Sequence, residues 1–86
     1  MREAGSTMDD LVMEAIRRSV LEVLPELEAS QVTEEVSLTD LGANSIDRTD
    51  VVTMTMDDLG VSVPVGEFRD VRDIGSLARL LRRHSP

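Results

Sequence analysis

A chain of 86 residues forms one domain with a small core, because a domain of this size buries only about 60% of the surface that its unfolded chain exposes. The absence of cysteine and the presence of a single histidine, His84, exclude disulfides, a Ser-His-Asp triad and a zinc module. The net charge of −8 argues against binding to nucleic acid or to anionic membranes.

The charge is unevenly distributed along the chain. Residues 1–59 contain fourteen acids and four arginines, whereas residues 60–86 contain three acids and five arginines. The acidic part favours partners with basic docking surfaces, although solubility alone also explains such a charge. No apolar run approaches the roughly 20 residues that cross a bilayer, and the N-terminal residues lack the apolar region of a signal peptide, so we expect a cytoplasmic protein.

The first helix is predicted to run from Met8 to Leu24, because apolar residues recur three and four positions apart. Thr7 and Asp10 have the spacing of a capping pair, and Pro25 ends or bends the helix. The inward positions are Val12, Ala15, Ile16, Val20, Val23 and Leu24.

Residues 28–43 show no sustained hydrophobic period, which predicts a long connection with a helical turn near 37–41. We expect this connection to be pinned by Val32, Val36, Leu38 and Leu41.

The second helix is predicted to begin at Asn44 or Ser45, both good N-cap residues, and to end at Leu59 before the stop signal Gly60. Many of its residues are β-branched and therefore poor helix formers, so packing rather than propensity must hold it. We expect an inward stripe of Val52, Met56 and Leu59 and an exposed, mostly acidic surface of Asp47, Arg48, Asp50, Asp57 and Asp58.

The C-terminal third predicts an extended connector at 61–63, a short helix at 65–70 that inserts Phe68, and a final helix capped by Asp73. In the final helix Ile74, Leu77, Ala78 and Leu81 are expected to face inward, and Arg79, Arg82 and Arg83 suit the negative end of its dipole. The predicted fold class is all-α: a small four-helix bundle, with three main helices, one short helix and a long first loop. We expect a single domain over 1–86, with disordered ends at 1–6 and 84–86.

Ser45 has several interpretations from the residues alone. It caps a helix, as most serines in this position do. Alternatively it carries an anionic phosphodiester, which a helix N-terminus favours through its free N–H groups and positive dipole end, with Gly42 and Ala43 leaving steric room. A third interpretation, a small hydrolase that uses Ser45 as nucleophile, is disfavoured because no general base is in evidence for it.

Two stretches resemble the acyl carrier protein family: Asp-Leu-Gly-Ala-Asn-Ser-Ile-Asp at 40–47 and Asp-Asp-Leu-Gly-Val-Ser-Val-Pro at 57–64. The similarity extends over residues 8–83. It implies a carrier rather than an enzyme, with 4'-phosphopantetheine transferred from coenzyme A to Ser45 by a phosphopantetheinyl transferase, and with Gly42, Ala43 and Asn44 shaping the site. The family usually has Asp where Asn44 stands, so modification depends on a transferase that accepts Asn.

Residues 42–48, Gly-Ala-Asn-Ser-Ile-Asp-Arg, are also similar to discrete carriers of polyketide β-branching cassettes. That resemblance implies a monomeric carrier that presents an acyl thioester, such as acetyl or malonyl, to acyltransferase- and ketosynthase-like enzymes. It also implies acetyl donation to an HMG-CoA-synthase-like enzyme. The alternatives are a carrier of another fatty-acid, polyketide or peptide pathway, or an unmodified acidic interaction module.

Partner docking is expected on the second helix. Ile46 is the best single candidate, because an exposed apolar residue next to Ser45 can enter a partner's pocket, although packing against the loop explains it equally well. Arg48 adds a positive charge that selects among partners. The candidate docking residues are Ile46, Asp47, Arg48, Asp50, Thr53 and Asp57, and an ordinary solvated face is the alternative. Asp57 and Asp58 lack a calcium-loop pattern, so no metal site is expected.

Overall fold

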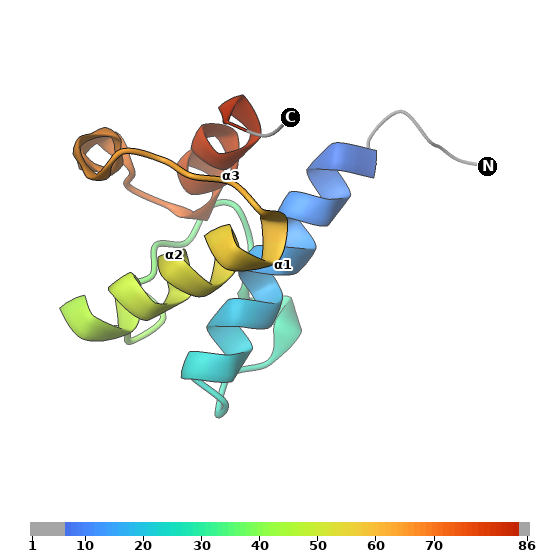
Figure 1. Cartoon of the computed structure of the whole chain (residues 1–86). Coiled ribbons are helices and arrows are strands. Elements are labelled where there is room, and N and C mark those ends of the chain that lie inside the picture. Colours follow the sequence, from blue (N-terminus) through green and yellow to red (C-terminus); the bar gives the residue numbers. More distant parts are fainter. Residues whose placement is uncertain (1–6, 85–86) are drawn as a thin grey trace.

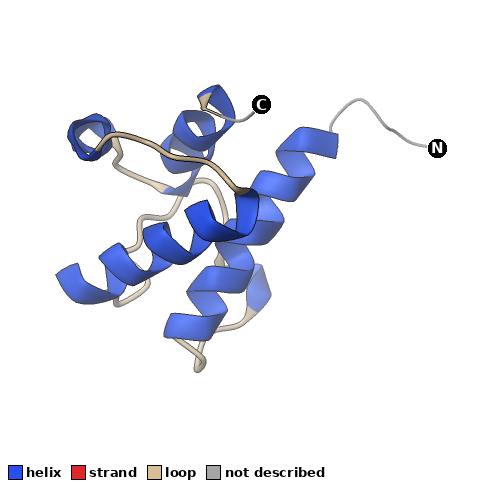
Figure 2. Cartoon of the chain, in the orientation of Figure 1, coloured by secondary structure: helices blue, strands red, loops and turns tan. Residues whose placement is uncertain are grey.

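The computed structural model describes residues 7–84, and its helices follow the predicted order (Figures 1 and 2). The three α-helices are α1 (Thr7–Val23), α2 (Ser45–Leu59) and α3 (Ile74–Arg83), and two short 3-10 helices are η1 (Ala29–Gln31) and η2 (Val65–Asp70). No strand occurs in the described part of the chain. The all-α fold class is therefore confirmed, with η2 as the short fourth helix and η1 as an additional turn that the sequence did not predict.

Helix α1 crosses α2 and also contacts α3, so its apolar face forms one side of the core (Figure 1). Val12, Ile16 and Val20 are fully buried on this face, as predicted. Val23 is only half-buried, because the helix ends there and Leu24 turns into the core instead. The predicted capping pair at Thr7 and Asp10 concerns side chains outside the described part of the structure.

The long connection between α1 and α2 is hydrogen-bonded to α1 and to the start of α3. Arg17 of α1 donates from Nη2 to Val32 O at 3.1 Å and from Nε to Ala29 O at 3.3 Å. Backbone N–H groups at the start of α3 bond to Val36 O at 2.8 Å and Glu34 O at 2.9 Å. Val32 and Leu38 are buried and Val36 and Leu41 half-buried, so the predicted apolar pins are confirmed. The expected turn near 37–41 is also present, with Leu41 N bonded to Ser37 O at 3.2 Å.

The buried face of α2 differs from the predicted one. The predicted inward stripe of Val52, Met56 and Leu59 is half-buried against the core, so it is confirmed in part. The fully buried residues of α2 are Val51 and Thr55, one position earlier, which the sequence did not predict. Thr55 tolerates burial because its hydroxyl donates to Val51 O at 2.7 Å, which satisfies the polar group within the helix. Two residues of the predicted stripe, Val52 and Met56, line a pocket together with Val65 and Phe68 of η2.

Gly60 ends α2 in the left-handed conformation, with a φ of 69°. Its N–H bonds to the carbonyls of Asp57 and Met56, which closes the helix as predicted.

Gly60→Ala is expected to lower the free energy of unfolding by about 1 kcal/mol, because a Cβ is strained at this φ. Gly66→Ala is the control, since Gly66 has no positive φ and an added Cβ meets nothing within 4 Å. Urea unfolding compares the two, and equal effects would contradict the role of Gly60.

The C-terminal part packs η2 against α3 and confirms the remaining predicted elements. Asp73 caps α3 by accepting from Ser76 N at 2.8 Å, and this backbone hydrogen bond lowers the pKa of the Asp73 carboxyl. The predicted inward residues Ile74, Leu77, Ala78 and Leu81 are buried, and Leu80 joins them. Phe68 of η2 is half-buried against the core.

His84 lies at the end of α3, and its Nε2 is 3.0 Å from Glu67 Oε1 on η2. The disordered end predicted from residue 84 onward therefore begins at a residue that makes a contact in the fold. The other predicted ends, residues 1–6 and 85–86, lie outside the described residues. Within 7–84 no helix has the length and apolar character needed to cross a membrane.

Candidate functional site

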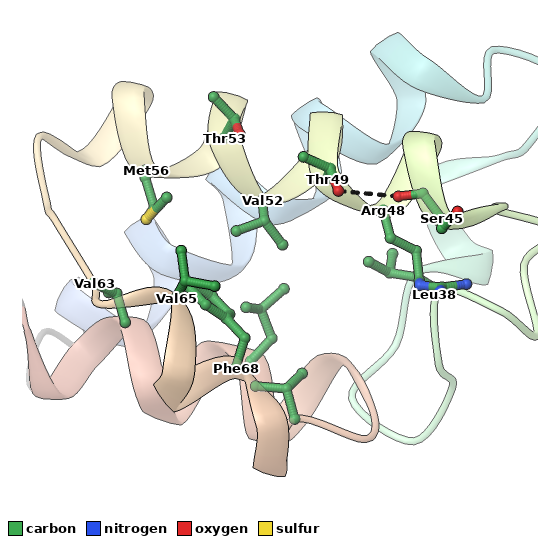
Figure 3. A pocket seen from close by; sticks show the side chains of 12 residues that line it. Leu38, Ser45, Arg48, Thr49, Val52, Thr53, Met56, Val63, Val65 and Phe68 are labelled. Carbon is green, nitrogen blue, oxygen red and sulfur yellow. Dashed lines mark hydrogen bonds between the residues drawn. The ribbon is translucent and has the colours of Figure 1, made fainter.

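Asn44, not Ser45, caps α2. Asn44 Oδ1 accepts a hydrogen bond from Asp47 N at 2.8 Å, and Asp47 Oδ2 accepts one from Asn44 N at 3.2 Å, which together form a capping box. The interpretation of Ser45 as a cap is therefore wrong. Its backbone carbonyl accepts from Thr49 Oγ1 at 3.0 Å, but its own hydroxyl is exposed and has no hydrogen bond within the described residues (Figure 3).

The turn before Ser45 fixes where the helix begins. Gly42 has a φ of 97°, a conformation that side chains rarely adopt, and its N–H bonds to Thr39 O at 2.9 Å. Ala43 N donates to Leu38 O at 3.0 Å, and the Ala43 side chain is 4% exposed and part of the core. Ala43 thus anchors the loop rather than leaving space beside Ser45. The result is an exposed hydroxyl on a rigidly held first turn.

A groove of about 410 Å³ begins at Ser45 and runs along α2. Figure 3 shows Val52 and Met56 of α2 pointing across it toward Val65 and Phe68 of the η2 wall. Its remaining lining residues are Leu38, Arg48, Thr49, Thr53, Val63, Val71 and Leu77. The groove is therefore apolar along most of its length and polar at the end beside Ser45, which suits a chain that is charged at its point of attachment and apolar beyond it.

The sequence reasoning missed this groove. Val52 and Met56 looked like core residues because they are apolar at helical spacing, and only the position of η2 leaves space opposite them. A usable signal was the alternation of valines at 61, 63 and 65, a spacing of two that does not fit a helix. Val63, Val65 and, farther along, Val71 line the groove. They supply an apolar wall from a segment that has little regular structure.

All candidate docking residues except Asp47 are exposed on the surface. Ile46 is 71% exposed, so it lies on the surface and is not packed against the loop. Arg48, Asp50, Thr53 and Asp57 are also exposed. Asp47 is half-buried and engaged in the capping box, so its carboxylate is less available. Asp58 pairs with Arg18 at 3.2 Å, and the described residues contain no cluster of metal-binding side chains.

The chemistry open to Ser45 follows from its surroundings. No general base contacts its hydroxyl among the described residues, and His84 is engaged with Glu67 at the end of α3. The N–H groups of Ser45 and Ile46 belong to the first turn, which has no intrahelical acceptor for them, so they favour an anion. The site therefore fits a hydroxyl that receives a phosphate-linked group from another enzyme.

Comparison with known proteins agrees with this geometry. Residues 14–81 match the family described as the phosphopantetheine attachment site, so the chain belongs to that family. Its members are carriers rather than catalysts, and the group they carry is 4'-phosphopantetheine. The chain is similar to the polyketide biosynthesis acyl-carrier protein AcpK of Bacillus subtilis (strain 168), with 39% identity over 70 residues, 81% of this chain and 85% of that protein. No solved structure gives a match.

Proposed function

We propose that this protein is an acyl carrier of a polyketide pathway that bears 4'-phosphopantetheine on Ser45. The observation that carries the proposal is the Ser45 hydroxyl at the first position of α2, inside the matched region. This hydroxyl is exposed and has no hydrogen bond to any described residue. The similarity to a carrier named for polyketide biosynthesis supports the pathway class. The groove that starts at Ser45 supports an attached group by offering space along α2 beside the attachment point.

Each residue around the site has a distinct task in this function. Asn44 and Asp47 fix the first turn of α2, so that the Ser45 hydroxyl projects into solvent toward a transferase. The free N–H groups of the first turn stabilise a phosphate on that hydroxyl. The bound group supplies the thiol that this cysteine-free chain lacks, and the thiol carries the acyl unit as a thioester. Exposed acids on α2 then allow weak, fast docking to successive enzymes.

The first experiment incubates the protein with coenzyme A and a broad-specificity phosphopantetheinyl transferase and measures its intact mass. We expect a gain of one phosphopantetheinyl group. No gain would favour the alternative of an unmodified acidic module. A transferase that requires Asp before the serine is the informative comparison, because Asn44→Asp should then restore loading while keeping the cap.

Within the pathway we propose the role of acetyl donor in β-branching. The support is the motif at 42–48, whose Arg48 lies exposed beside the attachment residue. The test compares transfer of acetyl from this carrier and from a generic carrier to an HMG-CoA-synthase-like enzyme. We expect faster transfer from this carrier. Equal rates would leave the general carrier function and remove the donor role.

Partner docking through α2 is tested by reversing an exposed charge. Asp50→Lys removes a carboxylate that forms no hydrogen bond within the described residues, so the fold should be unaffected. We expect affinity for a partner enzyme to fall about two- to tenfold at low salt and the difference to shrink as salt rises. Glu26→Lys, an equal change of charge at an exposed position after α1, is the control. Equal effects of both variants would indicate that only net charge matters.

A further inference from the structure

Arg48 lies three residues after Ser45 on α2, at a spacing that makes the two side chains neighbours on the helix surface. Both line the same end of the groove (Figure 3). The guanidinium makes two long hydrogen bonds, both from Nη1: one to Thr39 Oγ1 at 3.3 Å and one to Ala43 O at 3.4 Å. Its Nε and Nη2 form none within residues 7–84, so most of its hydrogen-bonding capacity is unused.

Arg48 also has no ion-pair partner among the described residues, although the chain contains seventeen acids. Arg17 and Arg18 form ion pairs with Glu14 and Asp58, but Arg48 forms none with a described residue. Of the two carboxylates closest to Arg48 in sequence, Asp47 accepts from Asn44 N, and Asp50 forms no hydrogen bond within the described residues.

A further carboxylate, Asp40, lies in the turn before α2, and its Oδ2 accepts from Ser37 N at 3.2 Å. The residue preceding Ser45 is the neutral Asn44, which caps α2 as well as an aspartate but adds no negative charge. Arg48 thus offers a positive charge that has no ion-pair partner among the described residues, while Asp40 and Asp47 keep their negative charges. An anion attached to Ser45 would lie directly beside Arg48.

We propose that Arg48 binds the phosphodiester of the 4'-phosphopantetheine on Ser45, within the same chain. This inference rests on the proposed function of Ser45. Because the phosphorus is bonded to Ser45 Oγ, the free Nε and Nη2 can form the paired, charge-assisted contact that guanidinium groups make with phosphates. Arg48 then acts as a positioning residue: it holds the phosphate against α2, with the rest of the arm directed along the apolar groove.

The test compares the loaded and unloaded forms of the wild type, Arg48→Gln and Arg48→Lys. For each protein, urea unfolding gives the ratio of the two unfolding equilibrium constants, so effects of the substitution on the unloaded fold cancel. At low salt we expect loading to stabilise the wild type about two- to fivefold more than Arg48→Gln, as for an exposed ion pair. Arg48→Lys should lie between them. At about 1 M salt, where the Debye length is about 3 Å, the ratios should converge.

Arg18→Gln is the matched control, because it removes the same charge beside Asp58 near the far end of α2. Its loading ratio should equal that of the wild type. The phosphorus-31 resonance of the loaded protein should shift in Arg48→Gln and not in Arg18→Gln. Unchanged ratios and an unchanged resonance in Arg48→Gln would overturn the contact while leaving the carrier function intact. Failure of the wild type to gain the mass of the arm would overturn both.

Discussion

Ser45→Ala is expected to abolish loading with 4'-phosphopantetheine and to leave the fold unchanged. The Ser45 hydroxyl is exposed and makes no hydrogen bond within the described residues, so its removal costs no contact in the folded state. Alanine is also a better helix former than serine. We expect no mass gain on incubation with coenzyme A and a transferase, and an unfolding midpoint equal to or slightly above that of the wild type.

The neighbouring residue provides the converse control. Asn44→Ala removes the acceptor for Asp47 N, and loss of such a cap costs about 1 kcal/mol. This variant should be less stable and still gain the mass of the arm. This result would show that attachment depends on Ser45 and that the cap of α2 depends on the adjacent residue, Asn44. A Ser45→Ala protein that is loaded as fully as the wild type would contradict the assignment.

The largest expected effect on stability comes from Ile16→Ala. Ile16 is fully buried in the middle of α1, among the residues that join α1 to the other helices. A large-to-small substitution of this kind costs about 2–5 kcal/mol, a large part of the roughly 5–15 kcal/mol that holds a domain together. We expect a correspondingly lower midpoint in urea, with partial unfolding in buffer.

Leu11→Ala is the matched control, because Leu11 is an apolar residue of the same helix that is 53% exposed. Its truncation should cost less than about 1 kcal/mol. Similar losses in the two variants would mean that the face of α1 assigned to the core is incorrect.

The ends of the helices were predictable because local chemistry sets them. An Asn-Ser pair before a helical run, Gly60 after it and Asp73 before the last run are each sufficient signals, and the structure places helix ends at all three. Residues 65–70 were predicted as a short helix from Pro64 and Phe68, and η2 has those bounds. The order of elements and the fold class follow from these signals.

Tertiary packing determined what the sequence could not predict. The face of α2 in the core depends on the direction from which α1 approaches, and a hydroxyl bonded within the helix let Thr55 replace the more apolar Met56. The choice of Asn44 over Ser45 as the cap required the geometry of the preceding turn. The groove required the placement of η2, which no local pattern specifies. The candidate attachment residue was therefore predictable, but its surroundings were not.

The substitution of Asn44 for the aspartate usual in acyl carriers can be understood together with Arg48. Both residues lower the negative charge beside Ser45, in a chain that is otherwise strongly acidic. Near a phosphodiester this arrangement reduces repulsion at the attachment point, while the exposed acids farther along α2 stay available for docking.

Fragmentation mass spectrometry of the loaded protein tests the central claim most directly. The protein is loaded with coenzyme A and a transferase, digested, and the modified peptide is fragmented to locate the added group. Cleavage after arginine places Ser45 in the peptide of residues 19–48. The account predicts that the added group lies on Ser45 of this peptide. A modified residue other than Ser45, such as Ser37 in the same peptide, or a protein that is never loaded, would contradict it.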